Sequence, residues 1–350
     1  MAQIRAGLVG VTGYTGMELV RLLENHPHIN LVAVTSRSDA GKKVHDIYPF
    51  MQGFATGELE ITVPDAPSLA KQCDVVFLAV PHGVAMTMAA AFRKEGVAII
   101  DLSADFRLRD VAVFETWYKA EHAEPALLKE AVYGLPELYA DQIAKAQLIA
   151  NPGCYPTTSI LSLAPALRNG FIHTAGIVID AKSGTTGAGR KAAVGSLYCE
   201  VADTFKAYNL TTHRHTPEIE QELSLVAGKD ITLSFNAHLL PVNRGILATI
   251  YTQLKDGVSF DTVYEAYTDA YEPHPFVRVL PKSALPELRN VRGTMFCDIG
   301  LVHDPRTGRL ILVAAIDNMC RGASGQAIAN ANLMHNLPIE TGLMLAPMVP

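Results

Sequence analysis

The sequence contains few cysteines, and their placement excludes two kinds of stabilised fold. The five cysteines, at positions 73, 154, 199, 297 and 320, are odd in number, scattered, and contain no CxxC pair. Such a set argues against a disulfide framework and against a zinc ribbon. We therefore expect no bound metal, and a location in a reducing cytoplasm.

Long hydrophobic runs and an excess of basic charge are also absent. The most apolar stretch, residues 74–92, is interrupted by Pro81, His82 and Gly83 and is too broken to cross a membrane. The formal net charge of -6 gives no reason to expect a nucleic acid or an anionic lipid surface as partner. A strand pattern begins within a few residues of Met1, so we expect no targeting peptide. The expected partners are small molecules.

The first half of the sequence alternates between apolar strand-like stretches and amphipathic helical ones. The strand-like stretches are IRAGLVGV, INLVAVTS, CDVVFLAV, VAIIDLS and QLIAN, and helical patterns such as GMELVRLLENHP and GVAMTMAAAFRKEG lie between them. Strands that are apolar almost throughout, alternating with helices, predict a doubly wound parallel sheet. We therefore predict an α/β protein whose first domain, residues 1–153, is of the Rossmann type.

The second half has longer strand-like stretches and a different architecture. TAGIVIDAKSG, residues 230–254 and residues 294–317 all have this character, and the turn DPRTG at residues 304–308 predicts a hairpin. This pattern predicts a second, α+β domain with a mixed or antiparallel sheet over residues 154–322. The final stretch, residues 323–350, begins as a helix rich in small residues, and we expect it to complete the first domain.

The glycine-rich turn after the first strand predicts a dinucleotide site. Glycines at this point of a βαβ unit allow a tight turn and a close approach of the backbone to a pyrophosphate at the helix N-terminus. Their spacing is one residue longer than the standard GxGxxG pattern, so a merely tight turn is the alternative. The residues expected to contact the cofactor are Gly10, Thr12, Gly13, Tyr14, Thr15 and Gly16.

The end of the second predicted strand distinguishes NADP from NAD. NAD enzymes usually place an acidic residue there to hold the ribose 2′-hydroxyl. Here the positions carry Ser36 and Arg37, with Lys42 and Lys43 shortly after. Hydroxyl and guanidinium groups suit a 2′-phosphate, so we predict NADP(H). If this interpretation is wrong, Arg37 is an ordinary solvated loop charge.

Cys154 is the candidate nucleophile. It stands in the stretch ANPGCYPT, after a predicted strand and at the start of a predicted helix that ends near Asn169 and Gly170. The positive end of the helix dipole stabilises a thiolate, which is the nucleophilic form. The other four cysteines lack such a turn and are interpreted as structural. A thiolate combined with a nicotinamide cofactor predicts acyl transfer to sulfur, followed by reduction of the thioester to an aldehyde.

A polar cluster, HRHTPE, is the candidate acid–base site. His213 and His215 point the same way in an extended segment, so either could exchange a proton with Cys154, and their spacing does not distinguish them. Glu218 closes the cluster and is assigned to substrate binding.

Two further groups are candidate binding residues. The loop KSGTTGAGRK has exposed N–H groups, hydroxyls and cationic ends that suit a phosphate or an oxyanion, so we assign Lys182 to substrate and Ser183 and Gly184 to the cofactor. A flexible surface loop is the alternative.

Arg107, just after a strand of the parallel sheet, is assigned to a substrate anion; a surface pair with Asp105 is the alternative.

The remaining cofactor candidates precede the final helix. Asn318 and Gly322 lie in the stretch DNMCRGASGQA, where small residues would let a nicotinamide ring approach the backbone. Close packing of the helix is the competing explanation.

With these residues identified, the sequence resembles the N-acetyl-gamma-glutamyl-phosphate reductases, relatives of aspartate-semialdehyde dehydrogenase, over nearly its full length. The length matches the longer of the family's two forms, type 1. The motifs that carry the resemblance are GLVGVTGYTG, LSADFRL, VYGLPEL, ANPGCYPT, KSGTTGAGR, HRHTPEI, HLLPVNRG and DNMCRGASGQA.

The resemblance implies a Rossmann domain with a dimerisation domain, NADPH as reductant, Cys154 as nucleophile and a basic residue in HRHTPE. The implied reaction, a step of arginine biosynthesis, converts N-acetyl-glutamyl 5-phosphate to the 5-semialdehyde and phosphate. It implies an even oligomer, a homodimer or homotetramer. A reductase for aspartyl phosphate or a carrier-linked amino-adipyl phosphate stays open, as does a non-catalytic NADP sensor.

Overall fold

Two separately packed units make up residues 3–349, which the computed structural model describes. The first contains the chain up to Pro152, together with Gly189–Lys191 and Ala323–Met344; the second contains Gly153–Ala188, Ala192–Gly322 and the chain from Leu345 onward. The boundary between them therefore lies one residue before the predicted one.

Of residues 323–350, which were predicted to complete the first domain, Ala323–Met344 pack with the first unit. From Leu345 onward the chain packs with the second unit. The physical reason is a pair of hydrogen bonds between Arg292 and Met348. The amide of Met348 donates to the carbonyl of Arg292, and the Arg292 guanidinium donates to the carbonyl of Met348, each over 3.0 Å.

The first unit is built on a seven-stranded sheet in the order β3-β2-β1-β4-β5-β7-β6, in which every pairing is parallel. This confirms the predicted Rossmann-type sheet. Its strands are β1 (Ile4–Val9), β2 (Ile29–Thr35), β3 (Ile61–Thr62), β4 (Val75–Leu78), β5 (Ala98–Asp101), β6 (Val132–Tyr133) and β7 (Leu148–Ala150). The sequence patterns missed β3 and β6, because two residues are too few to show a period.

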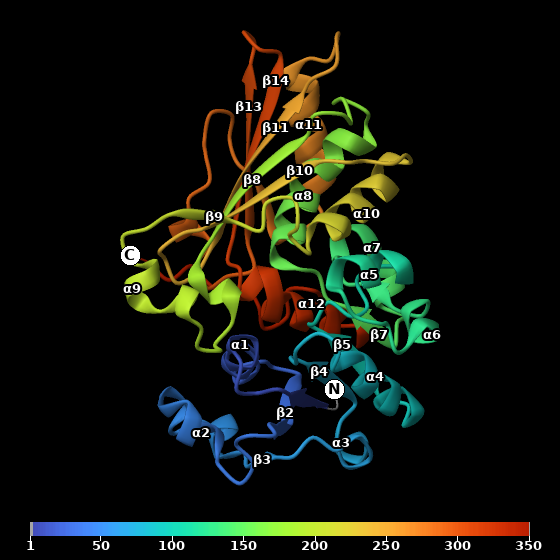
Figure 1. Cartoon of the computed structure of the whole chain (residues 1–350), viewed down its shortest axis with the longest axis vertical. Coiled ribbons are helices and arrows are strands. Elements are labelled where there is room, and N and C mark those ends of the chain that lie inside the picture. The colour runs from blue at the N-terminus through green and yellow to red at the C-terminus, as the bar shows by residue number, and fades with distance from the viewer. Residues whose placement is uncertain (1–2, 350) are drawn as a thin grey trace. The chain divides into compact units, whose positions relative to one another are not determined.

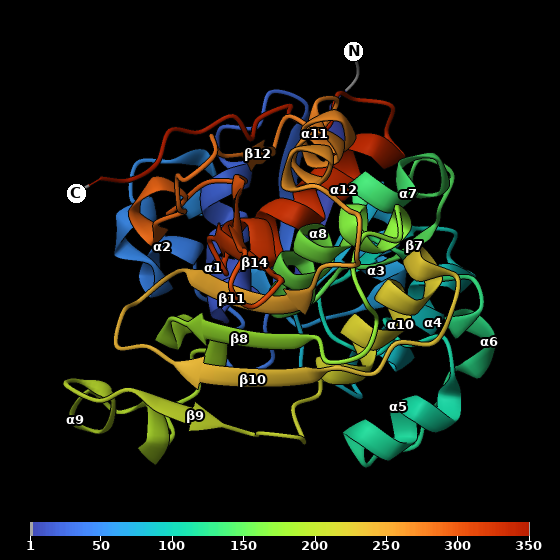
Figure 2. The ribbon, with the colours of Figure 1, turned by 90° about the horizontal axis from the view of Figure 1, so that it is seen from above.

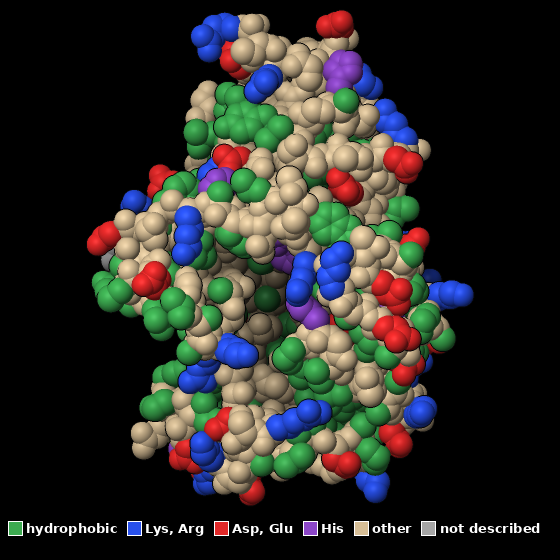
Figure 3. Space-filling model, in the orientation of Figure 1, with side chains coloured by type: hydrophobic (Ala, Val, Ile, Leu, Met, Phe, Trp, Pro, Cys, Tyr) green, Lys and Arg blue, Asp and Glu red, His purple; other side chains and the backbone are tan. Residues whose placement is uncertain are grey.

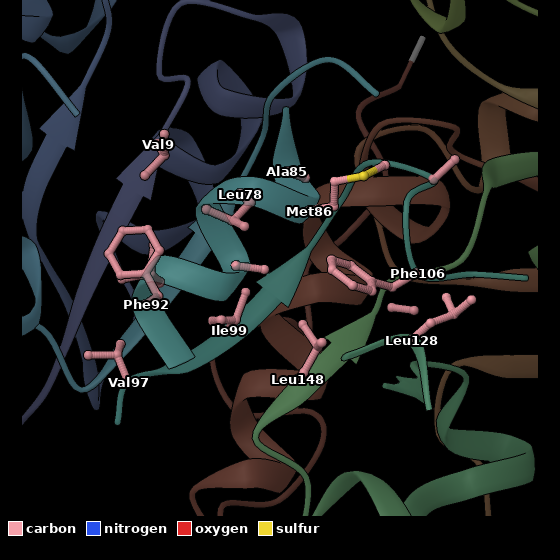
Figure 4. Packing of buried hydrophobic residues seen from close by; sticks show 14 of the residues in the cluster. Val9, Leu78, Ala85, Met86, Phe92, Val97, Ile99, Phe106, Leu128 and Leu148 are labelled. Carbon is pink, nitrogen blue, oxygen red and sulfur yellow. The ribbon is translucent and has the colours of Figure 1, made fainter. Parts of the chain in front are cut away.

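Helices surround this sheet and complete its core (Figure 1). They are α1 (Tyr14–Leu23), α2 (Val44–Ile47), α3 (Ala66–Gln72), α4 (Ala85–Lys94), α5 (Val111–Tyr118), α6 (Pro125–Leu128), α7 (Pro136–Ile143) and α12 (Gly325–Met334). Figure 4 shows side chains from β1, β4, β5, β7 and α4 meeting in one apolar cluster. Burial of such side chains is the main term that stabilises the unit.

Helix α12, drawn red in Figure 1 among blue and teal elements, packs against α1, α7 and β5. The side chains of Gln326 and Asn330 both donate to the carbonyl of Gly134, over 2.9 Å each. A Cβ on Gly134 would lie 2.4 Å from the Asn330 amide nitrogen, so a glycine is required for this approach. The C-terminal helix is therefore an integral part of the first unit.

The second unit is built on a mixed seven-stranded sheet in the order β12-β13-β14-β11-β8-β10-β9, and Figure 2 shows β14, β11, β8, β10 and β9 following one another across it. The β8–β10 and β12–β13 pairs are parallel and the others antiparallel, which confirms the predicted mixed sheet. Its strands are β8 (Val178–Ser183), β9 (Lys206–Tyr208), β10 (Ser234–Leu239), β11 (Ile246–Gln253), β12 (Val277–Val279), β13 (Cys297–Asp304) and β14 (Arg309–Ile316).

The predicted hairpin at residues 304–308 joins β13 to β14. Residues 230–254, a single strand-like stretch by pattern, form two strands, β10 and β11, with β8 between them. The helices of this unit are α8 (Cys154–Arg168), α9 (Tyr198–Val201), α10 (Thr216–Ala227) and α11 (Phe260–Tyr271). Helix α8 packs against β11 and β14 and against α10.

Acidic and basic side chains are interspersed on the face of the molecule that Figure 3 shows, in line with the small net charge. Across residues 3–349, every helix is too short or too polar to traverse a lipid bilayer.

Candidate active site

Cys154 is the first residue of α8, as predicted, and its backbone is fixed from both sides. Gly153 caps the helix, and its amide N–H donates to the Glu218 carboxylate over 2.9 Å. On the other side, a Cβ on Gly322 would lie 2.6 Å from the Cβ of Cys154. Contacts under 3 Å do not occur between such atoms, so only a glycine can occupy position 322. Its small size therefore serves close packing on Cys154.

Glu218, which was predicted to bind substrate, contacts the chain beside Cys154. It lies on the first turn of α10, and its side chain is 1% exposed. Burial of a carboxylate is unfavourable unless hydrogen bonds compensate for the lost water, and the Gly153 amide supplies one. The contact couples the start of α8 to the start of α10.

The two histidines of HRHTPE have different environments. His213 is buried among aromatic rings, with centroid distances of 5.4 Å to Tyr155 and 5.1 Å to Phe235. Its Nδ1 accepts the backbone N–H of His215 over 3.1 Å. Loss of water around the ring, with a smaller contribution from the charge of Arg214, lowers the pKa of His213 to about 4. His213 is therefore neutral at neutral pH.

His215 caps α10 and is only half-buried. Its ring lies 5.9 Å from that of Tyr155 and 4.9 Å from that of His213. The Tyr155 and Tyr208 hydroxyls are hydrogen-bonded over 3.0 Å, and burial raises the pKa of Tyr208 to about 12. Tyr155 directly follows Cys154, so both imidazoles contact the turn that carries the sulfur. Tyr155 and Tyr208 were not predicted, because nothing in their local sequence distinguishes them from core aromatics.

Ser183, Gly184 and Asn318 lie together in the second unit. The Gly184 amide donates to the carbonyl of Gly245 over 2.9 Å. Asn318 uses both ends of its amide: its oxygen accepts from the Gly245 amide (2.7 Å) and its nitrogen donates to Thr186 (3.0 Å). The Ser183 hydroxyl donates to the carbonyl of Gly184 over 3.1 Å. The structure therefore brings these three predicted residues into one network, in which Asn318 ties the loop after β8 to the loop before β11.

Asp317, which the sequence patterns missed, anchors the segment that ends in Gly322. Its side chain is fully buried and accepts hydrogen bonds from the amides of Gly293, Met319 and Cys320 and from the Arg244 guanidinium. A signal was present, since an aspartate that follows a buried strand needs compensating donors.

Lys182 does not share a face with Ser183. Along β8 the even-numbered side chains lie on the half-exposed face and the odd-numbered ones on the buried face. The Lys182 ammonium binds the Asp180 carboxylate over 2.9 Å, and the other oxygen of that carboxylate lies 3.0 Å from His238. Lys182 is thus a member of a charged cluster on the half-exposed face of the sheet.

Arg107 is buried, so the alternative of a surface pair with Asp105 is wrong. Its guanidinium donates to the carbonyls of Asn151 (2.8 Å) and Leu102 (3.0 Å). Asp105 is also buried and accepts from the amides of Gly83 and Met86 at the start of α4. Arg107 therefore braces the chain that leads, three residues later, to Cys154.

The glycine turn between β1 and α1 has the shape that a bound pyrophosphate requires. Gly10 has φ +92°, and a Cβ there would lie 2.2 Å from the carbonyl of Ala79. A Cβ on Gly16 would lie 2.5 Å from the carbonyl of Gly10, whereas Gly13 caps α1 with open space beside it. Two glycines thus permit close packing and the third leaves room at the helix N-terminus. Thr12, Tyr14 and Thr15 lie in the same turn.

The positions predicted to bind the 2′-phosphate directly follow β2. Ser36 is buried, and its hydroxyl lies 3.2 Å from that of Ser38. Arg37 is exposed, and within residues 3–349 its guanidinium has no hydrogen bond or ion pair. This side chain is therefore available to a ligand.

Comparisons with known proteins agree with this geometry. Residues 5–146 match the family model described as the NAD-binding domain of semialdehyde dehydrogenase, and residues 154–318 match the model of its dimerisation domain.

Two solved structures share the fold. An aspartate semialdehyde dehydrogenase II from Vibrio cholerae, complexed with ASA, has a TM-score of 0.72 at 15% identity and covers 96% of this chain and 99% of its own. The aspartate semialdehyde dehydrogenase with NADP from Candida albicans has a TM-score of 0.72 at 17% identity, over 95% of this chain and 99% of its own.

Sequence relatives are much closer. The N-acetyl-gamma-glutamyl-phosphate reductases of Pelotomaculum thermopropionicum and Desulforudis audaxviator are each 50% identical to this chain, over 97% and 99% of it and over 97% and 100% of their own lengths. That of Geotalea daltonii is 50% identical over 97% of this chain and 98% of its own.

A dinucleotide-type sheet, joined in sequence to a mixed-sheet unit with a cysteine at a helix N-terminus, defines a semialdehyde dehydrogenase. The protein is therefore an NAD(P)-dependent oxidoreductase. Within this class, the half-identical relatives place the chain in the N-acetyl-gamma-glutamyl-phosphate reductase family, to which it belongs over its whole described length.

The desolvated imidazole of His213 predicts a pH dependence of stability. Its pKa is about 4 in the folded protein, below the ordinary value of 6.5, so the unfolded chain binds the extra proton between these values. The stability from this group is complete above pH 6.5 and is lost as the pH falls toward 4, by about 3 kcal/mol in total. His213→Phe keeps a ring in the aromatic cluster but has no proton to bind. Its free energy of unfolding, measured by urea unfolding at a series of pH values, should therefore change less between pH 6.5 and 4 than that of the parent protein.

The exposed His173 is the matched control. His173→Phe should leave the loss of stability between pH 6.5 and 4 as it is in the parent protein. An unchanged curve for His213→Phe would contradict the buried, neutral state of His213.

Proposed function

We propose that the chain reduces N-acetyl-L-glutamyl 5-phosphate to N-acetyl-L-glutamate 5-semialdehyde and phosphate, with NADPH as the reductant, as a step of arginine biosynthesis. The observation that carries the proposal is the setting of Cys154, whose backbone at the start of α8 is held between the Glu218 carboxylate and Gly322. The half-identical relatives named for this reaction support the choice of substrate. The cysteine content supports a cytoplasmic location.

Cys154 acts as the nucleophile. Its thiolate, stabilised by the amides and dipole of α8, attacks the acyl carbon, and the carbon–oxygen bond to phosphate breaks with its electron pair on the leaving phosphate. The product of this step is a thioester on Cys154. NADPH, when bound, supplies the hydride that converts the thioester to the aldehyde level. The carbon–sulfur bond then breaks, which releases the semialdehyde and regenerates the thiolate.

His215 serves as the acid–base group, and His213 positions it. A catalytic base must exchange protons near the working pH, and a buried imidazole with a pKa of about 4 does not do so. His215 is half-exposed at the start of α10, and its backbone N–H is held by His213. It protonates the leaving group and takes up the thiol proton.

Other predicted residues have supporting roles. Glu218 fixes the cysteine turn, and Arg107 holds a substrate anion while its backbone contacts keep it in place. Ser183, Gly184, Asn318 and Gly322 shape the backbone that receives the nicotinamide. Gly10, Gly13 and Gly16, with the neighbouring Thr12, Tyr14 and Thr15, receive the pyrophosphate.

Replacing Cys154→Ser should abolish turnover and leave NADPH binding intact, because the sulfur and the glycine turn perform separate tasks. Turnover is measured in the reverse direction, with NADP, phosphate and a semialdehyde, and NADPH binding by calorimetry. Cys199→Ser, at an exposed cysteine, is the matched control and should leave both quantities unchanged.

The same assay tests the substrate. N-acetyl-glutamate 5-semialdehyde should be oxidised with a higher kcat/KM than aspartate semialdehyde. A preference for aspartate semialdehyde would overturn the assignment of substrate, and full activity of Cys154→Ser would overturn the thioester route.

Replacing Arg37→Asp should weaken NADPH binding by about tenfold or more and affect NADH much less, because the exposed guanidinium meets the 2′-phosphate that only NADPH carries. Dissociation constants for both nucleotides, measured by calorimetry, provide the comparison. Equal weakening of the two would show that Arg37 does not meet this phosphate.

We also infer that the protein is a homodimer or homotetramer assembled through its second unit. Residues 154–318 match a model described as a dimerisation domain. Large apolar side chains are exposed there within one short segment, residues 194–210, and Tyr198 is 84% exposed. Exposed apolar patches of this kind mark interaction sites.

Light scattering should give a mass two or four times the 37.8 kDa of one chain. Replacing both Leu197→Asp and Tyr198→Asp should shift the protein toward the monomer, whereas Leu285→Asp, at an exposed leucine outside the segment, should not. A monomeric parent protein would refute the assembly.

A further inference from the structure

Three residues of the glycine-rich loop after β8 belong to the first unit, although the chain on both sides of them belongs to the second. These are Gly189–Lys191, flanked by Ala188 and Ala192. The segment returns directly to the second unit, so what holds it on the first must be its own side chains. Arg190 supplies those contacts.

Arg190 is fixed on the glycine turn although its side chain is exposed. Its guanidinium donates to the carbonyl of Thr12 over 3.0 Å and to the Tyr48 hydroxyl over 3.2 Å. It also lies over the Tyr48 ring, 5.1 Å from the centroid. Tyr48 is buried, and its hydroxyl lies 3.0 Å from the carbonyl of Val11, which belongs to the same turn. An exposed arginine loses side-chain entropy when it is held in this way, so three simultaneous contacts define a specific position.

The Arg190 side chain lines a cavity together with both parts of the predicted dinucleotide site, the glycine turn and the segment after β2. The cavity, of about 440 Å³, is lined by Thr12 and Gly13 of the glycine turn, by Asp39 and Ile47 beyond β2, and by Arg190 and Lys191. Both hydrogen bonds from Arg190 use the same guanidinium nitrogen, Nη1. The other donors of the planar group are left for a ligand in this cavity.

The charges around this cavity favour an anion over a ribose hydroxyl. Asp39 is the acidic residue nearest to the end of β2, but both of its oxygens are engaged, one by Ser38 (2.7 Å) and one by Lys42 (2.8 Å). The hydrogen bond from Lys42 is the main cause that lowers the pKa of Asp39, and the charge of Arg190 contributes less. Lys42 compensates the charge of Asp39. The other charged residues that line the cavity, Arg190 and Lys191, are both basic and give it a positive balance.

We propose that Arg190 binds the 2′-phosphate of NADPH together with Arg37, and thereby makes the loop after β8 a determinant of cofactor specificity. A guanidinium matches a phosphate in shape and charge. The contact of the Arg190 guanidinium with the Tyr48 ring fixes the orientation of the guanidinium before the cofactor binds. Arg190 follows β8 in the chain but packs with the first unit, so a residue distant in sequence from the glycine turn contributes to the cofactor site of that unit. The inference rests on the proposed use of NADPH.

Calorimetric titration of the full chain with NADPH and with NADH tests this role without any measurement of turnover. Arg190→Ala should raise the dissociation constant of NADPH about tenfold and that of NADH less than about twofold. Arg190→Lys, which keeps the charge and loses the planar group, should give an intermediate value for NADPH. Tyr48→Phe, which removes one of the two acceptors that hold Arg190, should raise the NADPH constant by less than Arg190→Ala does.

Arg306→Ala is the matched control, since Arg306 is an exposed arginine paired with Asp304 at the tip of the β13–β14 hairpin. It should leave both dissociation constants unchanged, and thermal unfolding of each variant checks that the first unit is intact. Equal weakening of NADPH and NADH in Arg190→Ala would overturn the inference, because it would assign Arg190 to the pyrophosphate or to the turn itself. Unchanged binding of both would overturn it as well. A parent protein without preference for NADPH would instead overturn the proposed cofactor.

Discussion

A hydrogen bond from the Gly153 amide to a buried carboxylate fixes the geometry on which the proposed chemistry depends. Glu218 stands on α10 and Gly153 caps α8, so the contact holds together the starts of two helices that are far apart in the sequence. The carboxylate has little access to water, so breaking this hydrogen bond would destabilise the folded protein. Cys154 comes next in the chain, and the Gly322 backbone packs directly on it. The sulfur is therefore attached to a backbone with little freedom to move.

The same helix start gives different environments to two histidines that are equivalent in the sequence. His213 enters the aromatic cluster and loses its proton affinity, whereas His215 remains half-exposed at the cap of α10. The imidazole of His213 holds the backbone of His215, because the His215 backbone N–H donates to Nδ1 of His213. A short polar motif thus places two imidazoles in different environments beside the cysteine turn.

Much of the fold followed from local patterns. The strands of the parallel sheet were predictable where they are buried on both faces and apolar throughout, as in β4 and β5. The strands β3 and β6 were not predictable. They are strands because they pair with β2 and β7, and their own sequences show no strand pattern. The sequence of residues 230–254 did not show that they form two strands with β8 between them, because that arrangement depends on the order of strands in the sheet. The last residues leave the first unit because of Arg292, which is more than fifty positions away.

The sequence alone determined which residues carry reactive groups and which local conformations the backbone adopts. The glycines of the first turn, the cysteine at a helix start and the hairpin at residues 304–308 are local in origin, since each depends on dihedral preferences or on a helix dipole within a few residues. Tertiary structure decided what those groups face. It used both ends of the Asn318 amide, placed His238 beside the Asp180 carboxylate, and placed Arg190 on Tyr48. Burial and pairing depend on distant segments of the chain, and no local pattern contains that information.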